Sequence, residues 1–315
     1  MDKGKRLHRV NIFCHNFDYT SNSGPNKFTR QLFLQIQKNK KINITSQEEA
    51  DVEFCLIQMI KPKIKKAVLR LDGIYFNSDQ DFDQQNTPIK YSYENADAVV
   101  FQSEFNKLLT EAWFGSHDNY HVIHNGADLE LIKKIPSTIL DNTLSENISV
   151  WSCASSWRPH KRLEENIRYF LEHADKKTVF AIAGKNPDFE VISKYQKISN
   201  NRILYLGELD YASLISLYKR SEKFIHLAYL DHCPNVVVDA QASGCDVVCS
   251  NSGGTKEIVY RGKVIMEDEW DFSPIQLYKP PAMNFERYQI ISRDKCDSIK
   301  ESAEKYLKVL ESQID

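Results

Sequence analysis

The sequence lacks the features that mark secreted, zinc-binding and membrane-spanning proteins. Its 7 cysteines are scattered and odd in number, and none forms a C-x-x-C pair, so neither a zinc site nor a disulfide framework is indicated. No apolar run is long enough to span a membrane, and the Lys/Arg-rich start has no apolar signal region. We therefore expect a cytoplasmic protein of the reducing cytosol, whose membrane contact would be peripheral.

The sequence also lacks an excess of charge of one sign. Its formal net charge of -2 argues against a protein built to coat nucleic acid. Basic residues nevertheless outnumber acidic ones in residues 1–70, and the reverse holds in residues 71–147. The basic N-terminal third includes Lys38, Lys40, Lys41, Lys61, Lys63, Lys65 and Lys66. A solvated face is the ordinary interpretation of such a stretch, and contact with a polyanion or a membrane surface is the functional one.

The signatures of several common enzyme classes are missing. There is no G-x-S-x-G nucleophile elbow, and the Gly-containing segments lack the Walker lysine pattern, which disfavours nucleoside triphosphate hydrolysis. Asp81-Phe82-Asp83 has the D-x-D form, but no strand precedes it, and we interpret it as surface charge. His160 and His232 lack the spacing of a metal-ligand set. We expect neither a metal ion nor a cofactor.

The chain of 315 residues is long enough for two α/β domains. Short apolar runs alternate with helical stretches, as in parallel-sheet domains. Ile135–Asn147 loses this periodicity and resembles an interdomain linker, and Trp270–Phe285 resembles a second connector. We predict an N-terminal domain over residues 1–143 and a C-terminal domain over 144–275. Residues 276–315 would form a connector and a closing helix that packs back toward the N-terminal domain.

Apolar patterning and capping residues predict the individual elements. The expected strands are Val10–Cys14, Val52–Ile57, Ala67–Leu71, Ala98–Phe101, Tyr120–Ile123, Ile148–Ser152, Thr178–Ala183, Arg202–Leu206, Phe224–Ala228 and Asp246–Ser250. The expected helices are one opened by Pro25, one capped by Ser103 and running through Ala112, and Arg162–His173, Tyr211–Arg220, Asn235–Ser243 and Ile299–Leu310. The polar stretch Phe76–Thr87 is expected to be a surface loop.

The segment from Asp231 to Gly244 carries the most chemistry. A strand ends at Ala228, a short loop presents Asp231, and a helix begins at about Asn235. The N-terminus of a helix offers N–H groups and a partial positive charge, which suit a diphosphate. Asp239 follows about one turn into that helix. Two carboxylates beside a phosphate-binding helix end suit a sugar nucleotide, in which hydroxyl groups flank a diphosphate.

This segment resembles the signature of retaining GT-B glycosyltransferases, in particular glycosyltransferase family four (glycosyl transferases group 1), where two acidic residues stand eight positions apart with Pro-Asn between them. The family usually carries Glu at both places, and this sequence has Asp. The Gly253-Gly254 turn before Glu257, Leu206-Gly207-Glu208 and His124-Asn125-Gly126-Ala127-Asp128 resemble further family landmarks in the family's order. The resemblance covers nearly the whole chain. It implies two Rossmann-like domains that face each other across a cleft.

The resemblance also implies an activity: transfer of a sugar from a UDP- or GDP-sugar to an acceptor, with retention of configuration and without a metal. Lys161 and Arg158 would neutralise the diphosphate, Asp231 would bind sugar hydroxyls and Asp239 the ribose. Lys161 matches the family's lysine, whereas Ser156 stands at the usual arginine position, so Arg158 would substitute.

Further residues take their expected roles from the same resemblance. The C-terminal domain would contact the donor through Asn235, Val236, Gly207, Glu208, Gly253 and Gly254. In the N-terminal domain, Gly24 would approach the donor phosphate, and Asp72 marks the place where the family often has a histidine facing the sugar. Asp72 would alternatively bind the acceptor or cap a turn.

Other functions stay open at this level. One is a donor-binding module with weak or no catalysis, which the paired aspartates and the missing histidine favour. Another is a different enzyme on the same fold, such as a sugar-nucleotide epimerase, or a phosphorylase, although no pyridoxal-binding lysine environment is evident. The acceptor is undetermined among a lipid-linked sugar, a glycan, a protein, a small metabolite and a modified nucleic-acid base.

Overall fold

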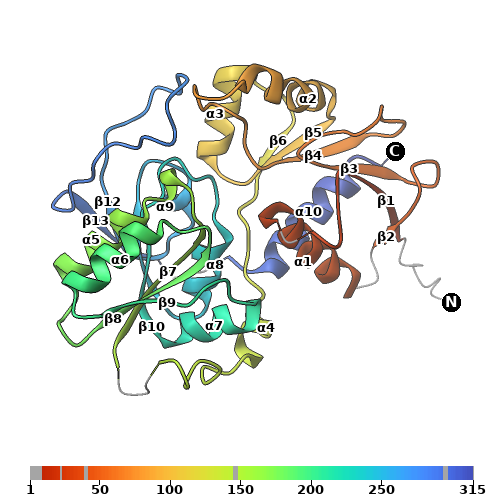
Figure 1. Cartoon of the computed structure of the whole chain (residues 1–315). Helices are drawn as coiled ribbons and strands as arrows, with labels where there is room; N and C mark the ends of the chain where they lie inside the picture. Colours follow the sequence, from red (N-terminus) through yellow and green to blue (C-terminus); the bar gives the residue numbers. More distant parts are fainter. Residues whose placement is uncertain (1–8, 22, 39–41, 145–147, 294–296, 315) are drawn as a thin grey trace. The chain divides into compact units, whose positions relative to one another are not determined.

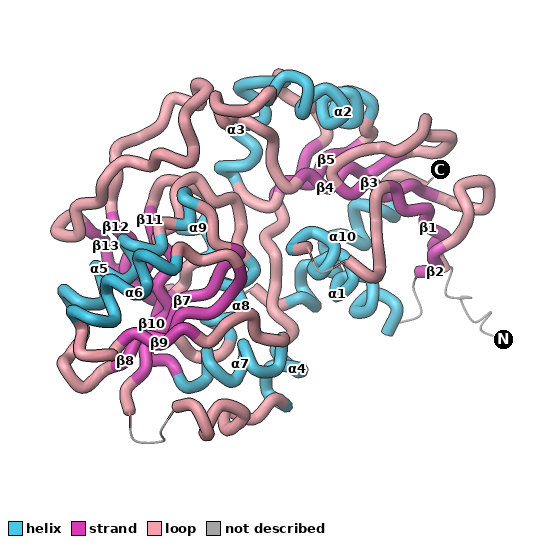
Figure 2. Tube along the Cα trace, in the orientation of Figure 1, coloured by secondary structure: helices cyan, strands magenta, loops and turns pink. Residues whose placement is uncertain are grey.

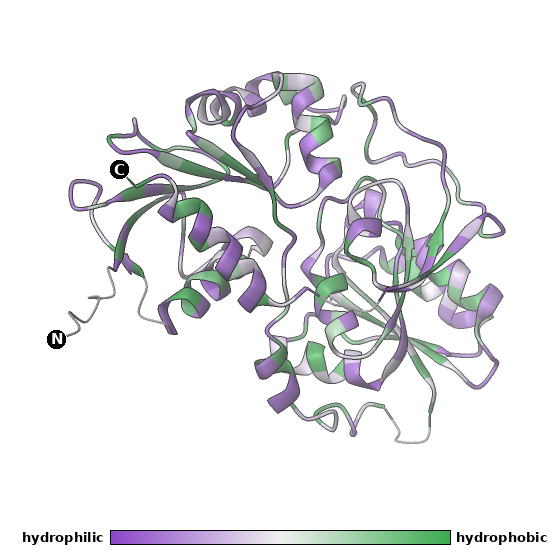
Figure 3. Cartoon of the chain, turned by 180° about the vertical axis from the view of Figure 1, so that it is seen from behind, coloured by the Kyte–Doolittle hydropathy of each residue, from purple (hydrophilic) through white to green (hydrophobic). Residues whose placement is uncertain are grey.

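The computed structural model describes residues 9–21, 23–38, 42–144, 148–293 and 297–314, and the chain divides into two compact units. The first unit comprises residues 1–75, 81–126 and 297–315, and the second comprises residues 76–80 and 127–296. Each unit is built around its own sheet, whose apolar strands are visible in Figure 3.

The sheet of the first unit is entirely parallel, with the order β2-β1-β3-β4-β5-β6. Its strands are β1 (Val10–His15), β2 (Ile42–Ile44), β3 (Val52–Leu56), β4 (Ala67–Leu71), β5 (Ala98–Phe101) and β6 (Tyr120–Val122). All residues of β3, β4 and β5 are buried, as expected for strands covered on both faces. The direction of strand addition reverses between β1 and β3, because β2 is added on the far side of β1.

Helices cover both faces of this sheet (Figure 1). On one face α1 (Gly24–Lys38) and α10 (Ile299–Glu311) pack together over Val10 and Ile12 of β1. On the other face lie α2 (Phe82–Asn95) and α3 (Glu104–Phe114). The predicted cap of α3 is confirmed, because the Ser103 hydroxyl accepts a hydrogen bond from the Asn106 N–H at 3.1 Å.

The surface loop predicted for residues 76–87 is wrong at both ends. Phe76 and Asn77 are buried and belong to the second unit, where the Ile275 N–H donates to the Phe76 carbonyl and the Ile275 carbonyl accepts from the Ser78 N–H. The helix α2 already begins at Phe82, and the Asp81 carboxylate caps it by accepting from the Gln84 N–H at 3.0 Å. The polar composition of this stretch and Pro88 inside the helix hide both features in the sequence.

The sheet of the second unit has the order β13-β12-β11-β10-β7-β8-β9 and is parallel except for β13. Its strands are β7 (Val150–Ser156), β8 (Val179–Lys185), β9 (Ile203–Tyr205), β10 (Ser221–His226), β11 (Asp246–Ser250), β12 (Arg261–Ile265) and β13 (Tyr288–Ser292). The chain adds β8 and β9 on one side of β7 and then crosses to add β10 and β11 on the other. The strand order therefore reverses between β7 and β10.

Two apolar cores lie on the two faces of this sheet. On one face pack α5 (Leu163–His173) and α6 (Phe189–Ile198). On the other pack α4 (Leu129–Lys134), α7 (Tyr211–Arg220), α8 (Asn235–Ala242) and the short α9 (Thr255–Ile258). A one-turn 3₁₀ helix, η1 (Pro159–Lys161), precedes α5. The predicted fold class is thus confirmed: the chain contains two parallel-sheet α/β units of the Rossmann-like kind.

The division between the units falls after Gly126, earlier than the aperiodic stretch Ile135–Asn147 indicates. Ile132, Ile135 and Leu144 are buried in the core of the second unit, so the stretch up to Leu144 packs as part of that unit. Residues 145–147 lie outside the described residues. The aperiodic stretch 276–293 also belongs to the second unit, whereas α10 belongs to the first.

Candidate functional site

Two loops meet at the point where the strand order of the second unit reverses. The first follows β7 and contains η1, and the second follows β10 and leads into α8. Since β7 and β10 are parallel neighbours, their carboxyl ends lie at the same edge of the sheet. In open α/β sheets, ligands bind at this edge, beside the strands between which the order reverses. The fold therefore brings Lys161 of the first loop to Asp231 of the second.

Asp231 is held by two donors on one carboxylate oxygen. The Lys161 Nζ lies 2.5 Å from Oδ2, and the His226 Nε2 lies 2.9 Å from the same atom. The side chains of Lys161 and Asp231 are 17% and 16% exposed, so the pair is accessible but largely desolvated. This arrangement leaves Oδ1 turned away from both donors, where it contacts the His232 N–H at 3.1 Å.

The charge of this cluster is set by burial and by the ion pair. Burial alone would raise the pKa of Asp231, but the Lys161 ammonium and the hydrogen bond from His226 outweigh it and hold the pKa well below its usual range. Burial lowers the pKa of His226 against the pull of Asp231. Burial likewise lowers the pKa of His160 to about 3 and that of His232 to about 4. At neutral pH the cluster therefore contains one cation, one anion and neutral imidazoles.

The Gly253-Gly254 turn packs directly against the Asp231 loop. The Gly254 N–H donates to the Asp231 carbonyl oxygen at 2.8 Å. A Cβ atom on Gly253 would lie 2.4 Å from that oxygen, which is closer than real Cβ contacts come. Gly253 is thus needed for the loop to approach, and the predicted contact of both glycines with the donor stays a prediction.

The helix α8 presents its N-terminus beside Asp231. Its N-cap residue is Pro234, which makes no side-chain cap hydrogen bond. Asn235 and Val236 form the first turn of this helix. Asp239 lies one turn further on, and the Tyr211 hydroxyl donates to its Oδ1 at 3.3 Å. The end of α8 and its two flanking carboxylates therefore lie along one edge of one unit.

Other predicted residues of the second unit lie on loops at the same edge. Arg158 is exposed and is the N-cap residue that precedes η1. Gly207 follows β9 with φ of 74°, a conformation that favours glycine, and its carbonyl accepts from the Gly184 N–H. Glu208 is 68% exposed and lies 4.0 Å from the Lys185 ammonium. Their placement is compatible with donor contact, and their roles stay predictions.

Gly24 and Asp72 belong to the first unit. Gly24 is exposed at the start of α1. Asp72 follows β4 and forms an ion pair with Arg70, whose buried guanidinium also donates to Asn125 Oδ1 at 3.1 Å. The Asp72 backbone carbonyl accepts from Gln102 Nε2 at 2.6 Å. Asp72 is therefore rigidly held, and its predicted role toward sugar or acceptor stays a prediction.

Sequence reasoning missed His226 and a buried ion pair behind η1. Arg162 is 1% exposed, has φ of 52° and binds both carboxylate oxygens of Glu267 at 2.8 and 2.6 Å. It also donates to the Leu227 and Pro281 carbonyls. The available signal was a run of basic residues at a helix start, where the helix dipole disfavours them. Arg162 anchors the loop that carries Lys161 to the interior of the unit.

Within the described residues, no group of three or more His, Cys, Asp or Glu side chains is arranged to hold a metal ion. The described helices include none that is long and apolar enough to cross a membrane.

One family model matches part of the chain. Residues 146–271 match the family model described as glycosyl transferases group 1, and they include both predicted aspartates. This segment is therefore a glycosyl transferases group 1 domain. No curated protein sequence matches the chain.

Several solved structures share the fold over nearly the whole chain. Anabaena HepE, solved with UDP-glucose, has a TM-score of 0.67 at 14% identity, covering 96% of this chain and 100% of HepE. Sucrose-phosphate synthase from Thermosynechococcus elongatus has a TM-score of 0.65 at 11% identity, covering 96% and 95%. A glycosyltransferase from Rickettsia africae has a TM-score of 0.61 at 16% identity, covering 98% and 99%. At these identities the likeness establishes the GT-B fold alone.

Proposed function

We propose that the protein is a glycosyltransferase that moves a sugar from a UDP- or GDP-sugar to an acceptor, with retention of configuration and without a metal. The observation that supports this most directly is the Lys161–Asp231 pair beside the N-terminus of α8, within the segment that matches the family. The fold shared with HepE, which was solved with UDP-glucose, adds support for a nucleotide-sugar donor.

In the proposed complex, the diphosphate lies at the N-terminus of α8, against the N–H groups of Asn235 and Val236. An ammonium group has three N–H donors, and Lys161 uses one on Asp231, so others can reach a phosphate oxygen. Arg158 adds a second cation as charge builds on the departing diphosphate. Asp231 then faces the sugar hydroxyls, and Asp239 the ribose.

The proposed chemistry needs no strong protein base. The departing diphosphate takes the proton of the acceptor hydroxyl on the face from which the acceptor attacks, and configuration is retained. The neutral histidines around Asp231 neither supply nor cancel charge at neutral pH. The protein contributes positioning and electrostatic stabilisation of the leaving group.

We propose roles for the other predicted site residues as well. Gly207 and Glu208 contact the nucleobase side of the donor, and Gly253 and Gly254 hold the Asp231 loop against it. Gly24 and Asp72 act from the first unit, on the donor phosphate and on the sugar or acceptor. The acceptor is a glycan, a lipid-linked sugar, a protein, a small metabolite or a modified nucleic acid. We also propose that the basic N-terminal third contacts a membrane surface or a polyanion.

The test is incubation with radiolabelled UDP- and GDP-sugars, with nuclear magnetic resonance of the released sugar. Slow hydrolysis that retains anomeric configuration and persists in EDTA supports the proposal. Donor binding without turnover would instead favour the non-catalytic module, and release of an epimeric nucleotide sugar would favour an epimerase. Inverted configuration would contradict the retaining mechanism.

Substitution of Asp239 tests the site itself. Asp239→Ala should abolish hydrolysis and weaken donor binding about tenfold or more, because a hydrogen bond to a charged group contributes roughly 1.5–3 kcal/mol. Asp268→Ala is the matched control, since the Asp268 side chain is 94% exposed. Turnover at the wild-type rate in Asp239→Ala would remove the assignment.

A further inference from the structure

The connection between β3 and β4, residues 57–66, is a loop rather than a helix (Figure 2). It covers part of the face of β1 opposite α1 and α10. Ile12 packs toward α1 and α10, so its neighbour Phe13 points to the other face. There the Lys61 ammonium lies 4.5 Å from the centre of the Phe13 ring. The loop thus replaces a helix as the cover of this part of the sheet.

A buried carboxylate fixes the shape of this loop. Glu53 is fully buried on β3, and its Oε1 accepts from the N–H groups of Ile64 and Lys65 at 2.7 and 2.9 Å. Its Oε2 lies 2.7 Å from the His15 Nε2, and Gln47 donates to Oε1 at 3.0 Å. Burial would raise the pKa of Glu53, but these hydrogen bonds outweigh it and lower the pKa. The loop is therefore held by a charged, fully bonded anchor.

The outer surface of the loop alternates apolar and basic side chains. Ile60 is 60% exposed and Ile64 is 57% exposed, although large aliphatic side chains are usually buried. Lys61 and Lys65 are exposed between and beside them. Exposed apolar side chains grouped together mark protein or membrane interaction sites, and the lysines beside them add attraction to an anionic surface.

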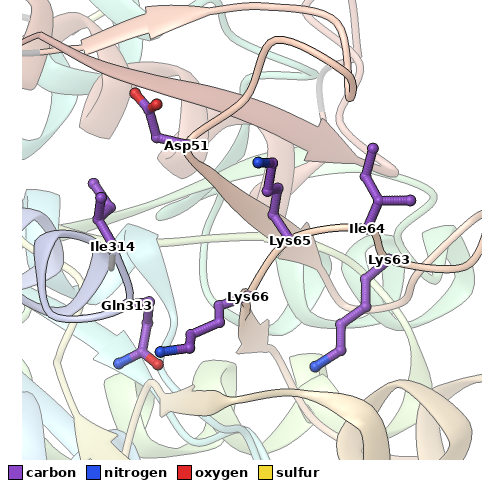
Figure 4. Close-up of a pocket in the computed structure, with 7 residues that line it drawn as sticks. All are labelled: Asp51, Lys63, Ile64, Lys65, Lys66, Gln313 and Ile314. Atoms are coloured by element: carbon purple, nitrogen blue, oxygen red, sulfur yellow. The ribbon is translucent and has the colours of Figure 1, made fainter.

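A hollow of about 600 Å³ lies beside the same loop (Figure 4). It is lined by Asp51, Lys63, Ile64, Lys65, Lys66, Gln313 and Ile314. Asp51 precedes β3 and Lys66 precedes β4, so the hollow lies at the amino ends of these strands. Substrates of parallel sheets bind at the carboxyl ends, so this hollow lies apart from the substrate edge. Its size and its lysines suit a phosphate headgroup.

We propose that loop 57–66 docks the protein on an anionic lipid surface. Ile60 and Ile64 enter the boundary between headgroups and acyl chains, and Lys61 and Lys65 meet lipid phosphates. Lys63 is engaged by Asp97 at 2.5 Å, and Lys61 lies within electrostatic range of Glu48, so the local positive charge is moderate. Exposed isoleucines gain from an apolar phase, which a nucleic acid does not offer, and this favours lipid over other polyanions.

This inference rests on the surface contact proposed for the N-terminal third, and it is independent of the donor chemistry. The experiment is co-sedimentation of the full chain with phosphatidylcholine vesicles, with and without phosphatidylglycerol. We expect binding that depends on phosphatidylglycerol and weakens with salt. Ile60→Ser with Ile64→Ser should reduce binding about tenfold or more. Lys61→Gln with Lys65→Gln should reduce it by about tenfold or more as well.

The matched control is Lys197→Gln with Ile198→Ser, a neighbouring Lys-Ile pair of the second unit in which Ile198 is 66% exposed. All variants should keep the thermal unfolding midpoint and the donor hydrolysis of the wild type, so a lost docking surface is distinguishable from a lost active site. The proposal is overturned if the wild type does not bind these vesicles, or if the isoleucine variant binds them as the wild type does. Equal loss of binding in the control pair would also overturn it.

Discussion

At the scale of single residues, the candidate site depends on how one carboxylate is oriented. Two donors share Asp231 Oδ2, and one of them, His226, is the last residue of strand β10 and is 4% exposed. The aspartate side chain is one methylene shorter than that of glutamate, so its carboxylate reaches less far toward a bound sugar. Its direction must therefore be fixed more tightly. In this structure the fixing comes from His226 and from the backbone contact with Gly254.

Replacing His226 tests this orientation. His226→Phe keeps a ring in the core and removes the donor to Asp231. We expect kcat/KM for donor turnover to fall about tenfold to a hundredfold, since hydrogen bonds to charged groups contribute roughly 1.5–3 kcal/mol. His226→Gln retains a donor and should restore part of the loss.

The control for this experiment is His173→Phe, which changes an exposed histidine that stacks on Tyr169. It should leave kcat/KM unchanged. If His226→Phe turns over the donor as fast as the wild type, the histidine has no part in positioning Asp231.

At the scale of elements, the loop after β7 buries a histidine that must stay neutral. His160 is 8% exposed and stacks on Tyr278 with ring centres 5.5 Å apart. Burial lowers its pKa to about 3 from the ordinary value of 6.5. Between these two pH values the unfolded chain binds a proton that the folded chain does not. The free energy of unfolding therefore rises with pH across this window and falls as the solution is acidified.

His160→Phe should flatten this pH dependence while keeping the stack on Tyr278. Between pH 7 and pH 5, we expect the wild type to lose about 2 kcal/mol more of its free energy of unfolding than the variant does. Urea unfolding at the two pH values measures the difference. An identical loss of unfolding free energy in both proteins would contradict the lowered pKa of His160. The imidazole would then bind a proton in the folded chain as readily as in the unfolded chain.

Elements with strong apolar periodicity were predictable, and those without it were not. Each strand expected from an apolar run has a counterpart in one of the two sheets, and the helix ending before Gly244 has that glycine at φ of 110°. The helix α2 was missed because its sequence is polar and contains Pro88. The edge strand β13 was missed because most of its residues are exposed. Its sequence therefore shows no alternation of buried apolar and exposed polar residues.

At the scale of the whole molecule, the last helix of the chain completes the core of the first unit. Tyr306 of α10 is fully buried, and its ring lies 6.2 Å from that of Phe28 and 6.4 Å from that of Phe54. A Cβ on Gly126 would lie 2.3 Å from the Ser298 backbone, so the chain approaches closely where α10 begins. The first unit is therefore assembled from both ends of the sequence.

Tyr306→Ala should destabilise the first unit by about 3 kcal/mol, because it leaves a large cavity in the core. Tyr288→Ala is the control, since Tyr288 is 50% exposed in the second unit. Differential scanning calorimetry should show a lower unfolding temperature for the first variant and little change for the second. A wild-type transition for Tyr306→Ala would contradict the assignment of α10 to this core.

The amino-acid pattern alone is sufficient to predict the two-unit α/β class and the loop that presents Asp231. Alternating apolar runs, Pro, Gly and capping side chains act locally and can be recognised in a linear pattern. The sequence does not predict that Lys161 and His226 share one oxygen of Asp231, or that Arg162 is buried against Glu267; both contacts are seen only in the folded chain. Tertiary structure also decided that residues 127–144 pack with the second unit. Apart from His226–Asp231, these contacts join residues far apart in the sequence, and they form because strand order, not sequence distance, sets which loops meet.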